Sequence, residues 1–173
     1  MDKQSQQTMF SSESSEWQTP QKFYDKLDQT FKFDLDPCAS ALTTKCEKYF
    51  TPEKDGLLQD WSGHRVFMNP PYGRGVDKWL KKAYEESAKP HTTVVCLIPA
   101  RTDTKYWHKY CMNADEIYFV KGRLKFAQQQ VTDTTVTTCC NAAPFPSAVV
   151  VFRGPPVEGM ARSRVRIATM ENK

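Results

Sequence analysis

The sequence predicts an α/β domain built on a mostly parallel, doubly wound sheet. Continuous apolar runs at residues 66–68, 93–98 and 117–120 are typical of buried parallel strands. Helical patterns and short connections alternate with these runs, as they do where crossover helices cover both faces of a sheet. The last apolar run, at residues 148–152, follows the preceding strand without an intervening helix. It can therefore run antiparallel beside that strand, which would make the sheet mixed.

The sequence also indicates a helix before the first of these strands. Thr19 has a side chain suited to an N-cap, and Pro20 suits the first helical position. Three large apolar side chains then recur at intervals of four residues, on one face of the helix: Phe23, Leu27 and Phe31.

Two more helices are expected between the strands. In the first, apolar side chains recur at helical spacing: Val76, Trp79, Leu80 and Ala83. The second begins after a cap at Thr102 or Asp103 and carries an aromatic-rich stretch at residues 106–111. Short strands are expected at residues 33–36 and 49–50.

Length and composition suit one intracellular domain. A chain of 173 residues is long enough for a core but short for a catalytic domain plus a separate recognition domain. The net charge of +4 permits nucleic acid as a partner without requiring it. No signal peptide and no run of about 18 apolar residues is visible, so we expect a soluble, cytoplasmic protein with no membrane partner. Six cysteines lack C-x-x-C spacing and only three histidines occur, so we expect reduced thiols and no metal site.

Two terminal segments are expected to lie outside the packed domain, which comprises residues 16–153, and one polar segment is expected within it. Residues 1–15 are rich in Gln and Ser and are predicted to be disordered. Residues 127–141 are rich in Gln and Thr, too polar for a core, and suit a flexible flap or a disordered loop. Residues 154–173 form a basic tail that is either solvated or an arm that contacts phosphates.

The most informative stretch is Asn69-Pro70-Pro71-Tyr72, directly after the strand at residues 66–68. In open α/β sheets, chemistry takes place beyond the carboxyl ends of the strands. The two prolines stiffen the turn and remove backbone donors, which leaves a site rich in acceptors. The Asn69 side-chain oxygen and the Pro70 carbonyl can accept hydrogen bonds from one planar amino group, and Tyr72 offers a ring for stacking.

This arrangement suits a reaction at the amino group of an aromatic base. Such an amine is a poor nucleophile because its lone pair is delocalised into the ring. Two acceptors pull its hydrogens out of the ring plane and localise the lone pair as a new bond forms. The site would therefore stabilise the transition state more than the ground state.

Seven stretches in chain order carry a family resemblance: W-Q-T-P, F-D-L-D-P-C-A-S, D-G-L-L-Q-D-W, N-P-P-Y-G, L-I-P-A-R-T-D-T-K-Y-W, G-R-L-K-F and P-F-P-S-A-V-V-V-F. Together, over about residues 16–153, they resemble the phage-encoded Dam-like DNA N6-adenine methyltransferases. The resemblance implies the class I methyltransferase fold, which is Rossmann-like, and S-adenosylmethionine as methyl donor. It also implies transfer to the exocyclic N6 of adenine in DNA, by a phage or prophage protein acting in a bacterial host cell.

The resemblance further implies roles for individual residues. Asn69, Pro70, Pro71 and Tyr72 match the family's catalytic motif. Eight positions match its segments for binding the methyl donor: Trp17, Thr19, Pro20, Asp36, Pro37, Ala39, Ser40 and Asp55. The segment around Thr19 matches the one against the donor's methionine part, and Asp55 matches an acid facing its ribose or adenine. The glycine-rich turn that most class I methyltransferases carry after the first strand is missing from this chain.

DNA is the expected partner, with the target base flipped out of the helix and stacked on Tyr72. Five basic residues near the expected carboxyl-end loops are candidates for phosphate contacts: Arg74, Arg101, Lys105, Arg123 and Lys125. Base readout is expected from loops such as residues 122–144, from the termini, or from the second subunit of a homodimer.

Other interpretations stay open at the level of sequence. The four residues of the catalytic motif also occur in RNA methyltransferases and in enzymes that methylate glutamine side chains of proteins. They do not separate adenine N6 from cytosine N4 in DNA. A non-catalytic, basic DNA-binding protein that kept the fold is the alternative from a different class.

Overall fold

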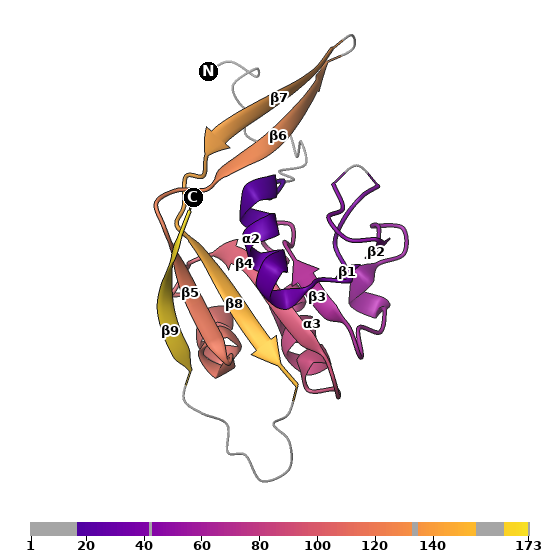
Figure 1. Ribbon diagram of the computed structural model, residues 1–173, viewed down its shortest axis with the longest axis vertical. Helices are drawn as coiled ribbons and strands as arrows, with labels where there is room; N and C mark the ends of the chain where they lie inside the picture. The colour runs from indigo at the N-terminus through magenta and orange to yellow at the C-terminus, as the bar shows by residue number, and fades with distance from the viewer. Residues whose placement is uncertain (1–16, 42, 133–134, 155–164, 173) are drawn as a thin grey trace, which may run out of the picture.

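Seven strands form the central sheet, in the order β2-β1-β3-β4-β8-β5-β9 (Figure 1). They are β1 (Leu35–Asp36), β2 (Lys48–Tyr49), β3 (Arg65–Met68), β4 (Thr93–Pro99), β5 (Glu116–Lys121), β8 (Ser147–Arg153) and β9 (Arg166–Glu171). The computed structural model describes residues 17–41, 43–132, 135–154 and 165–172. In this sheet β8 runs antiparallel to both neighbours, and the other pairs are parallel. The predicted mixed, mostly parallel sheet is therefore confirmed.

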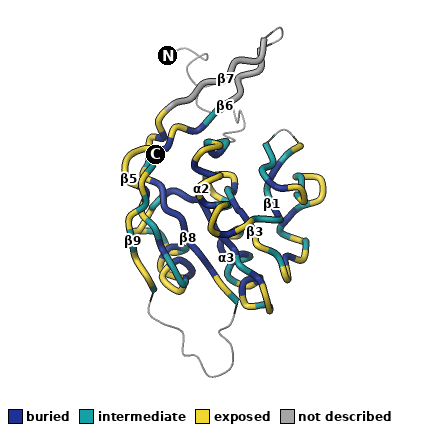
Figure 2. The backbone as a smooth tube through the Cα atoms, in the orientation of Figure 1, coloured by how far each residue is buried: buried dark blue, intermediate teal, exposed yellow. Residues whose placement is uncertain are grey.

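Helices cover both faces of the sheet. Successive residues of β4 divide between two hydrophobic clusters, because side chains alternate across a strand. Val95 and Leu97 pack in the cluster that contains α2 (Gln21–Phe31). Their neighbours on the other face pack with α3 (Val76–Ser87) and α4 (Lys105–Lys109). The central strands are thus buried on both sides, and β8 is dark blue along most of its length in Figure 2.

Both predicted helix caps are wrong. The helix α2 begins at Gln21, with Pro20 in the N-cap position and no side chain bonded to the cap. Thr19 lies one residue before the N-cap, and its hydroxyl accepts a hydrogen bond from Asn69. The helix α4 begins later than predicted, at Lys105, and no side chain caps it either. It is followed by the separate 3₁₀ turn η2 (Cys111–Asn113).

The polar stretch predicted to be a flap or a loop forms a regular hairpin. The strands β6 (Lys125–Thr132) and β7 (Thr135–Ala142) pair antiparallel along their full length. The alternative of a disordered loop is wrong, because backbone pairing does not require apolar side chains and the Thr and Val residues of this stretch favour extended structure. Figure 1 shows the hairpin projecting beyond the sheet, at the edge where the carboxyl ends of β3 and β4 lie.

The predicted basic tail also contributes to the fold. The strand β9 pairs in parallel with β5 over six residues and forms one edge of the sheet. The domain therefore extends to Glu171, beyond the predicted boundary at residue 153. The predicted disordered segment, residues 1–15, lies outside the described residues.

Two features are absent from the described part of the chain. None of the helices there is long and apolar enough to cross a membrane. No disulfide joins the cysteines whose side chains the structure describes.

The order of the strands predicts where a ligand binds. The chain runs from β1 outward to β2 and then returns to β3 on the other side of β1. In open α/β sheets such a reversal opens a crevice beyond the carboxyl ends of the two strands. Here that crevice lies between the end of β1, at Asp36, and the end of β3, at Met68.

Candidate active site

A pocket occupies the crevice beyond β1 and β3. Four segments line it: the N-terminal strap Trp17–Thr19, the turn after β1, the loop before β2 and the Asn-Pro-Pro turn after β3. The lining residues are Trp17, Gln18, Thr19, Asp36, Cys38, Ala39, Thr43, Lys45, Phe67, Asn69, Pro70 and Pro71. Seven of the twelve predicted catalytic and donor-binding residues are therefore brought together here: Trp17, Thr19, Asp36, Ala39, Asn69, Pro70 and Pro71.

The Asn69 side chain is held at both ends of its amide. Its Nδ2 donates to the Trp17 carbonyl at 2.5 Å and to the Thr19 hydroxyl at 3.1 Å. Its Oδ1 accepts from the Tyr72 hydroxyl at 2.7 Å. A carboxamide oxygen has two lone pairs, and the described residues use one of them, so one acceptor position of Oδ1 remains for another hydrogen bond.

The hydroxyl group of Tyr72 contacts the Asn69 side chain, whereas its ring packs against other aromatic rings. The hydroxyl lies 2.7 Å from Asn69 Oδ1 and 3.3 Å from the Leu97 carbonyl. Burial raises the pKa of Tyr72 well above its usual value, so the group stays protonated and acts as a hydrogen-bond donor. The ring packs edge-on against Phe126 and Phe145, at centroid distances of 6.1 and 5.3 Å. Stacking of a base on Tyr72 remains a prediction.

The Trp17 ring packs against the same two phenylalanines, at centroid distances of 5.6 and 5.5 Å. Trp17 and Tyr72 are thus packed on a shared support, which comes from β6 and from the segment before β8. Sequence reasoning missed this support. Its signal was the alternation of Leu124 and Phe126 and the Pro-Phe-Pro sequence at 144–146.

Asp36 places a buried carboxyl group in the pocket. The residue is 5% exposed, and its Oδ1 accepts a hydrogen bond from the Cys38 backbone N–H at 3.3 Å. Burial raises the pKa of Asp36 to about 7, although the backbone N–H groups of Cys38 and Lys45 and the charge of Lys45 act to lower it. A cation bound in the pocket would therefore favour the ionised carboxylate.

Lys45 supplies a positive charge to the same pocket, and sequence reasoning missed it. Its Nζ donates to Gln21 Oε1, at the start of α2, at 2.8 Å. Gln18, Cys38, Thr43 and Phe67 were also missed. Cys38 lies within the predicted motif at residues 36–40 and Thr43 follows it closely, so proximity in sequence was the available signal.

Five predicted site residues lie outside the lining: Pro20, Pro37, Ser40, Asp55 and Tyr72. Asp55 has a local role, because its carboxylate accepts from the Leu57 backbone N–H at 3.1 Å and caps the 3₁₀ turn η1 (Gly56–Leu58). That turn packs directly under the motif after β1, and a Cβ on Gly56 would lie 1.8 Å from the Pro37 carbonyl oxygen. The turn therefore supports one wall of the pocket.

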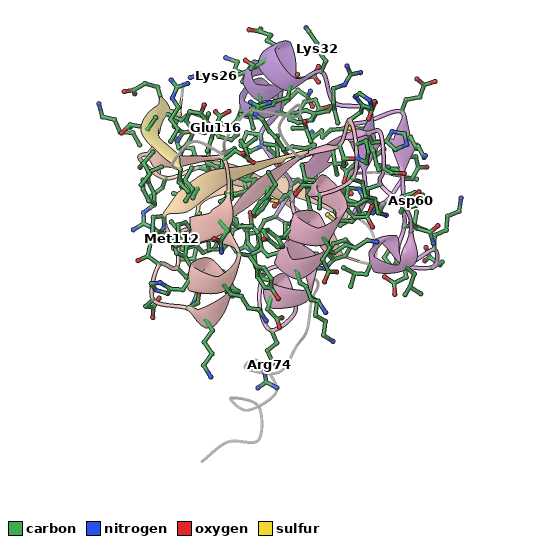
Figure 3. All side chains as sticks on the ribbon, turned by 90° about the horizontal axis from the view of Figure 1, so that it is seen from below. Lys26, Lys32, Asp60, Arg74, Met112 and Glu116 are labelled. Carbon is green, nitrogen blue, oxygen red and sulfur yellow. The ribbon has the colours of Figure 1, made fainter. Side chains whose placement is uncertain are left out.

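The five predicted DNA-contacting residues share one edge of the sheet. Arg74 follows β3, Arg101 and Lys105 follow β4, and Arg123 and Lys125 follow β5. These three strands are parallel, so the five side chains lie at the carboxyl edge that also holds the pocket. All five are exposed, and within the described part of the chain none of them forms an ion pair. Figure 3 shows Arg74 projecting outward from the molecule.

The described residues contain no group of three or more His, Cys, Asp or Glu side chains that could hold a metal ion. The side chains that line the pocket include the amide of Asn69, the carboxyl group of Asp36 and the ammonium group of Lys45.

Comparison with known proteins identifies the family. A protein-family model described as DNA N-6-adenine-methyltransferase (Dam) matches residues 6–172. The chain belongs to this family. The resemblance drawn from the seven motifs is therefore confirmed, and the Dam family match includes β9, which the motifs did not reach.

Relatives and a solved structure agree with this assignment to different extents. The DNA N-6-adenine-methyltransferase of Haemophilus phage HP1 is 34% identical over 122 residues, which is 69% of this chain and 70% of the relative. That of Escherichia phage T1 is 33% identical over 110 residues, which is 62% of this chain but only 45% of the relative. A Listeria monocytogenes protein solved as a candidate class I S-adenosylmethionine-dependent methyltransferase is 14% identical with a TM-score of 0.46, over 71% of this chain and 42% of that one. A similarity of that size carries no information about the reaction.

Proposed function

We propose that this Dam family member transfers a methyl group from S-adenosylmethionine to the exocyclic N6 of adenine in DNA. The observation that carries the proposal is the position and hydrogen bonding of the Asn69 side chain. Its amide oxygen follows the end of β3 beside the pocket and accepts one hydrogen bond from the described residues, which leaves one acceptor position. The family of the chain then indicates the acceptor, since its description is DNA N-6-adenine-methyltransferase.

In this proposal Asn69 and Pro70 act on the target amine. Asn69 Oδ1 accepts one N–H of the amino group, and the Pro70 carbonyl accepts the other. The Tyr72 hydroxyl bonds Oδ1 from the other side and holds it in place. S-adenosylmethionine supplies an electrophilic methyl group on a sulfonium sulfur, which is already a good leaving group. The methyl–sulfur bond would break as the nitrogen–carbon bond forms, with its electron pair left on sulfur, and the cationic amine would then release one proton to water and return to neutrality.

Asp36 and Lys45 suit the amino-acid end of the methyl donor. That end carries an ammonium and a carboxylate group, and the pocket offers a carboxyl group and an ammonium group. We assign Asp36 to the donor's ammonium and Lys45 to its carboxylate. The effect of the Lys45 charge on the pKa of Asp36 supports the pairing, because it shows that the two groups lie within electrostatic range of each other. Trp17 and Ala39 line the same pocket.

The DNA backbone would lie along the carboxyl edge, against Arg74, Arg101, Lys105, Arg123 and Lys125, with the target base flipped toward Asn69. The relatives are phage proteins, which supports action in the cytoplasm of a bacterial host. A homodimer would provide further surface for base readout, and light scattering with and without DNA tests that part of the proposal.

The decisive experiment is a nucleoside analysis. The purified protein is incubated with unmethylated DNA and S-adenosylmethionine, and the digested nucleosides are analysed by mass spectrometry. N6-methyladenine is the expected product. Detection of N4-methylcytosine, or of methylated RNA or methylated protein glutamine instead, would show that adenine N6 in DNA is not the acceptor.

The Asn69→Ala variant tests the catalytic residue. It should lose methyl transfer while binding S-adenosylmethionine nearly as well as the wild type in isothermal titration. Retained turnover would exclude the role given to Asn69. A wild-type protein that binds DNA but neither binds the methyl donor nor methylates any acceptor would be a non-catalytic DNA-binding protein.

A further inference from the structure

The strap Trp17–Thr19 joins the catalytic turn to the base of the β6–β7 hairpin. Gln18 pairs with Ala127 of β6 through two backbone hydrogen bonds, of 3.1 and 3.2 Å. The Trp17 ring packs against Phe126 on the same strand. The strap is therefore anchored independently of Asn69, and it can hold Asn69 in a defined position.

The orientation of the Asn69 amide decides whether the site can bind an amine. A carboxamide presents an acceptor at one end and two donors at the other. With Oδ1 toward the target position, the amide accepts an N–H; rotated by 180°, it presents donors to an amine that also has only donors. Rotation would additionally bring Oδ1 against the Trp17 carbonyl, which lies 2.5 Å from the present Nδ2 position. Two acceptors at that distance repel each other.

Thr19 is the side chain that completes this arrangement. The residue is 4% exposed, and its hydroxyl accepts the second Nδ2 hydrogen at 3.1 Å. Since the Trp17 contribution comes from backbone, Thr19 is the side chain through which the strap holds the amide. We infer that Thr19 is a positioning residue for Asn69, which keeps Oδ1 turned toward the target amine, rather than primarily a ligand of the methyl donor. This inference rests on the proposed function, and it gives Thr19 a role different from the one implied by the family resemblance.

Three variants separate positioning from donor binding and from a merely structural role. Thr19→Val keeps the shape but removes the acceptor, and Thr19→Ser restores it. The matched control is Thr92→Val. Thr92 is also buried, and its hydroxyl accepts from the Gly63 N–H and donates to the Pro90 carbonyl, but it precedes the amino end of β4, at the opposite edge from the pocket.

We expect Thr19→Val to lower kcat at saturating DNA and methyl donor by about tenfold, the rate equivalent of one hydrogen bond. Its Kd for S-adenosylmethionine should stay within about twofold of wild type, Thr19→Ser should recover most of kcat, and Thr92→Val should leave both constants unchanged. A Thr19→Val protein with weakened donor binding and wild-type kcat would overturn the inference, because Thr19 would then act on the methyl donor.

A measurement on the wild-type fold keeps the inference testable if Thr19→Val does not fold. The chain has four asparagines, so selective ¹⁵N-asparagine labelling gives a simple spectrum, and Asn69→Asp identifies the Asn69 side-chain signals. We expect the Asn69 amide hydrogens of the wild-type protein to exchange with solvent more slowly than those of the exposed Asn113. Exchange as fast as at Asn113 would overturn the inference. Failure of the proposed function is distinguishable, because wild-type protein would then produce no N6-methyladenine while the exchange measurement still reports on the amide.

Discussion

Replacing Asp36 by Asn should make the protein more stable at neutral pH and poorer at binding its methyl donor. Asn has nearly the shape of the protonated acid, so the substitution removes the charge and little else. Burial raises the pKa of this carboxyl group from 3.8 to about 7. The wild-type fold therefore resists ionisation of a group that ionises readily in the unfolded chain.

The size and sign of the effect follow from that pKa. A shift of about 3 units at 1.36 kcal/mol each is worth about 4 kcal/mol, an upper limit because the fold can relax around the charge. Between about pH 4 and pH 7 the folded state holds a proton that the unfolded state has lost. The free energy of unfolding of the wild type is therefore reduced progressively as pH rises through this window. That of Asp36→Asn is not reduced in this way, because Asn does not ionise.

The assay is urea unfolding of wild type and Asp36→Asn at pH 4.5 and pH 8, with Asp103→Asn, an exposed acid, as the control. We expect the stability of Asp36→Asn relative to wild type to increase by about 1 to 4 kcal/mol between the two pH values, while Asp103→Asn shows no such change. Isothermal titration at pH 7.5 should show binding of S-adenosylmethionine weakened by about 10- to 100-fold, as expected for loss of a charged hydrogen bond.

Two results would refute this reasoning. A stability difference between wild type and Asp36→Asn that is the same at both pH values would mean that no buried carboxyl group titrates in this window. A donor Kd unchanged by the substitution would mean that Asp36 does not face the donor's ammonium group.

Three further predictions concern the support of the site and its outer edge. Gly56→Ala should destabilise the fold by about 1 to 3 kcal/mol in urea unfolding, because its Cβ would lie 1.8 Å from the Pro37 carbonyl oxygen. The control Gly75→Ala should be neutral, because a Cβ there would meet open space. Equal effects of the two substitutions would contradict the packing argument. Glu86→Gln should lower the free energy of unfolding by about 3 kcal/mol, because the buried carboxylate accepts from a backbone N–H and two lysines; a change below about 0.5 kcal/mol would show that these bonds contribute little. Arg101→Ala should reduce the salt dependence of DNA binding by about one unit in a log–log plot without changing the donor Kd; an unchanged slope would remove Arg101 from the DNA contact surface.

Much of the fold was predictable because burial leaves a pattern in sequence. The apolar run before Asn69 and the one at residues 93–98 form β3 and β4, which are buried on both faces. By contrast, β9 lies at an edge, and exposed residues recur along it. Its backbone pairing with β5 does not require a run of apolar side chains, so its sequence suggested a tail. The hairpin was missed for the same reason.

The sequence by itself determined the Asn-Pro-Pro-Tyr turn, because Asn69 to Tyr72 are contiguous and the turn needs only a strand end and two prolines. It also determined the family, whose motifs lie in order along the chain. Only the tertiary structure decided how those parts meet. The contact between Asn69 and Thr19 spans 50 residues of sequence, and the raised pKa of Asp36 depends on surroundings that no local pattern records. Residue type sets what a group can do, whereas the packing of distant segments sets its orientation, its charge and its neighbours.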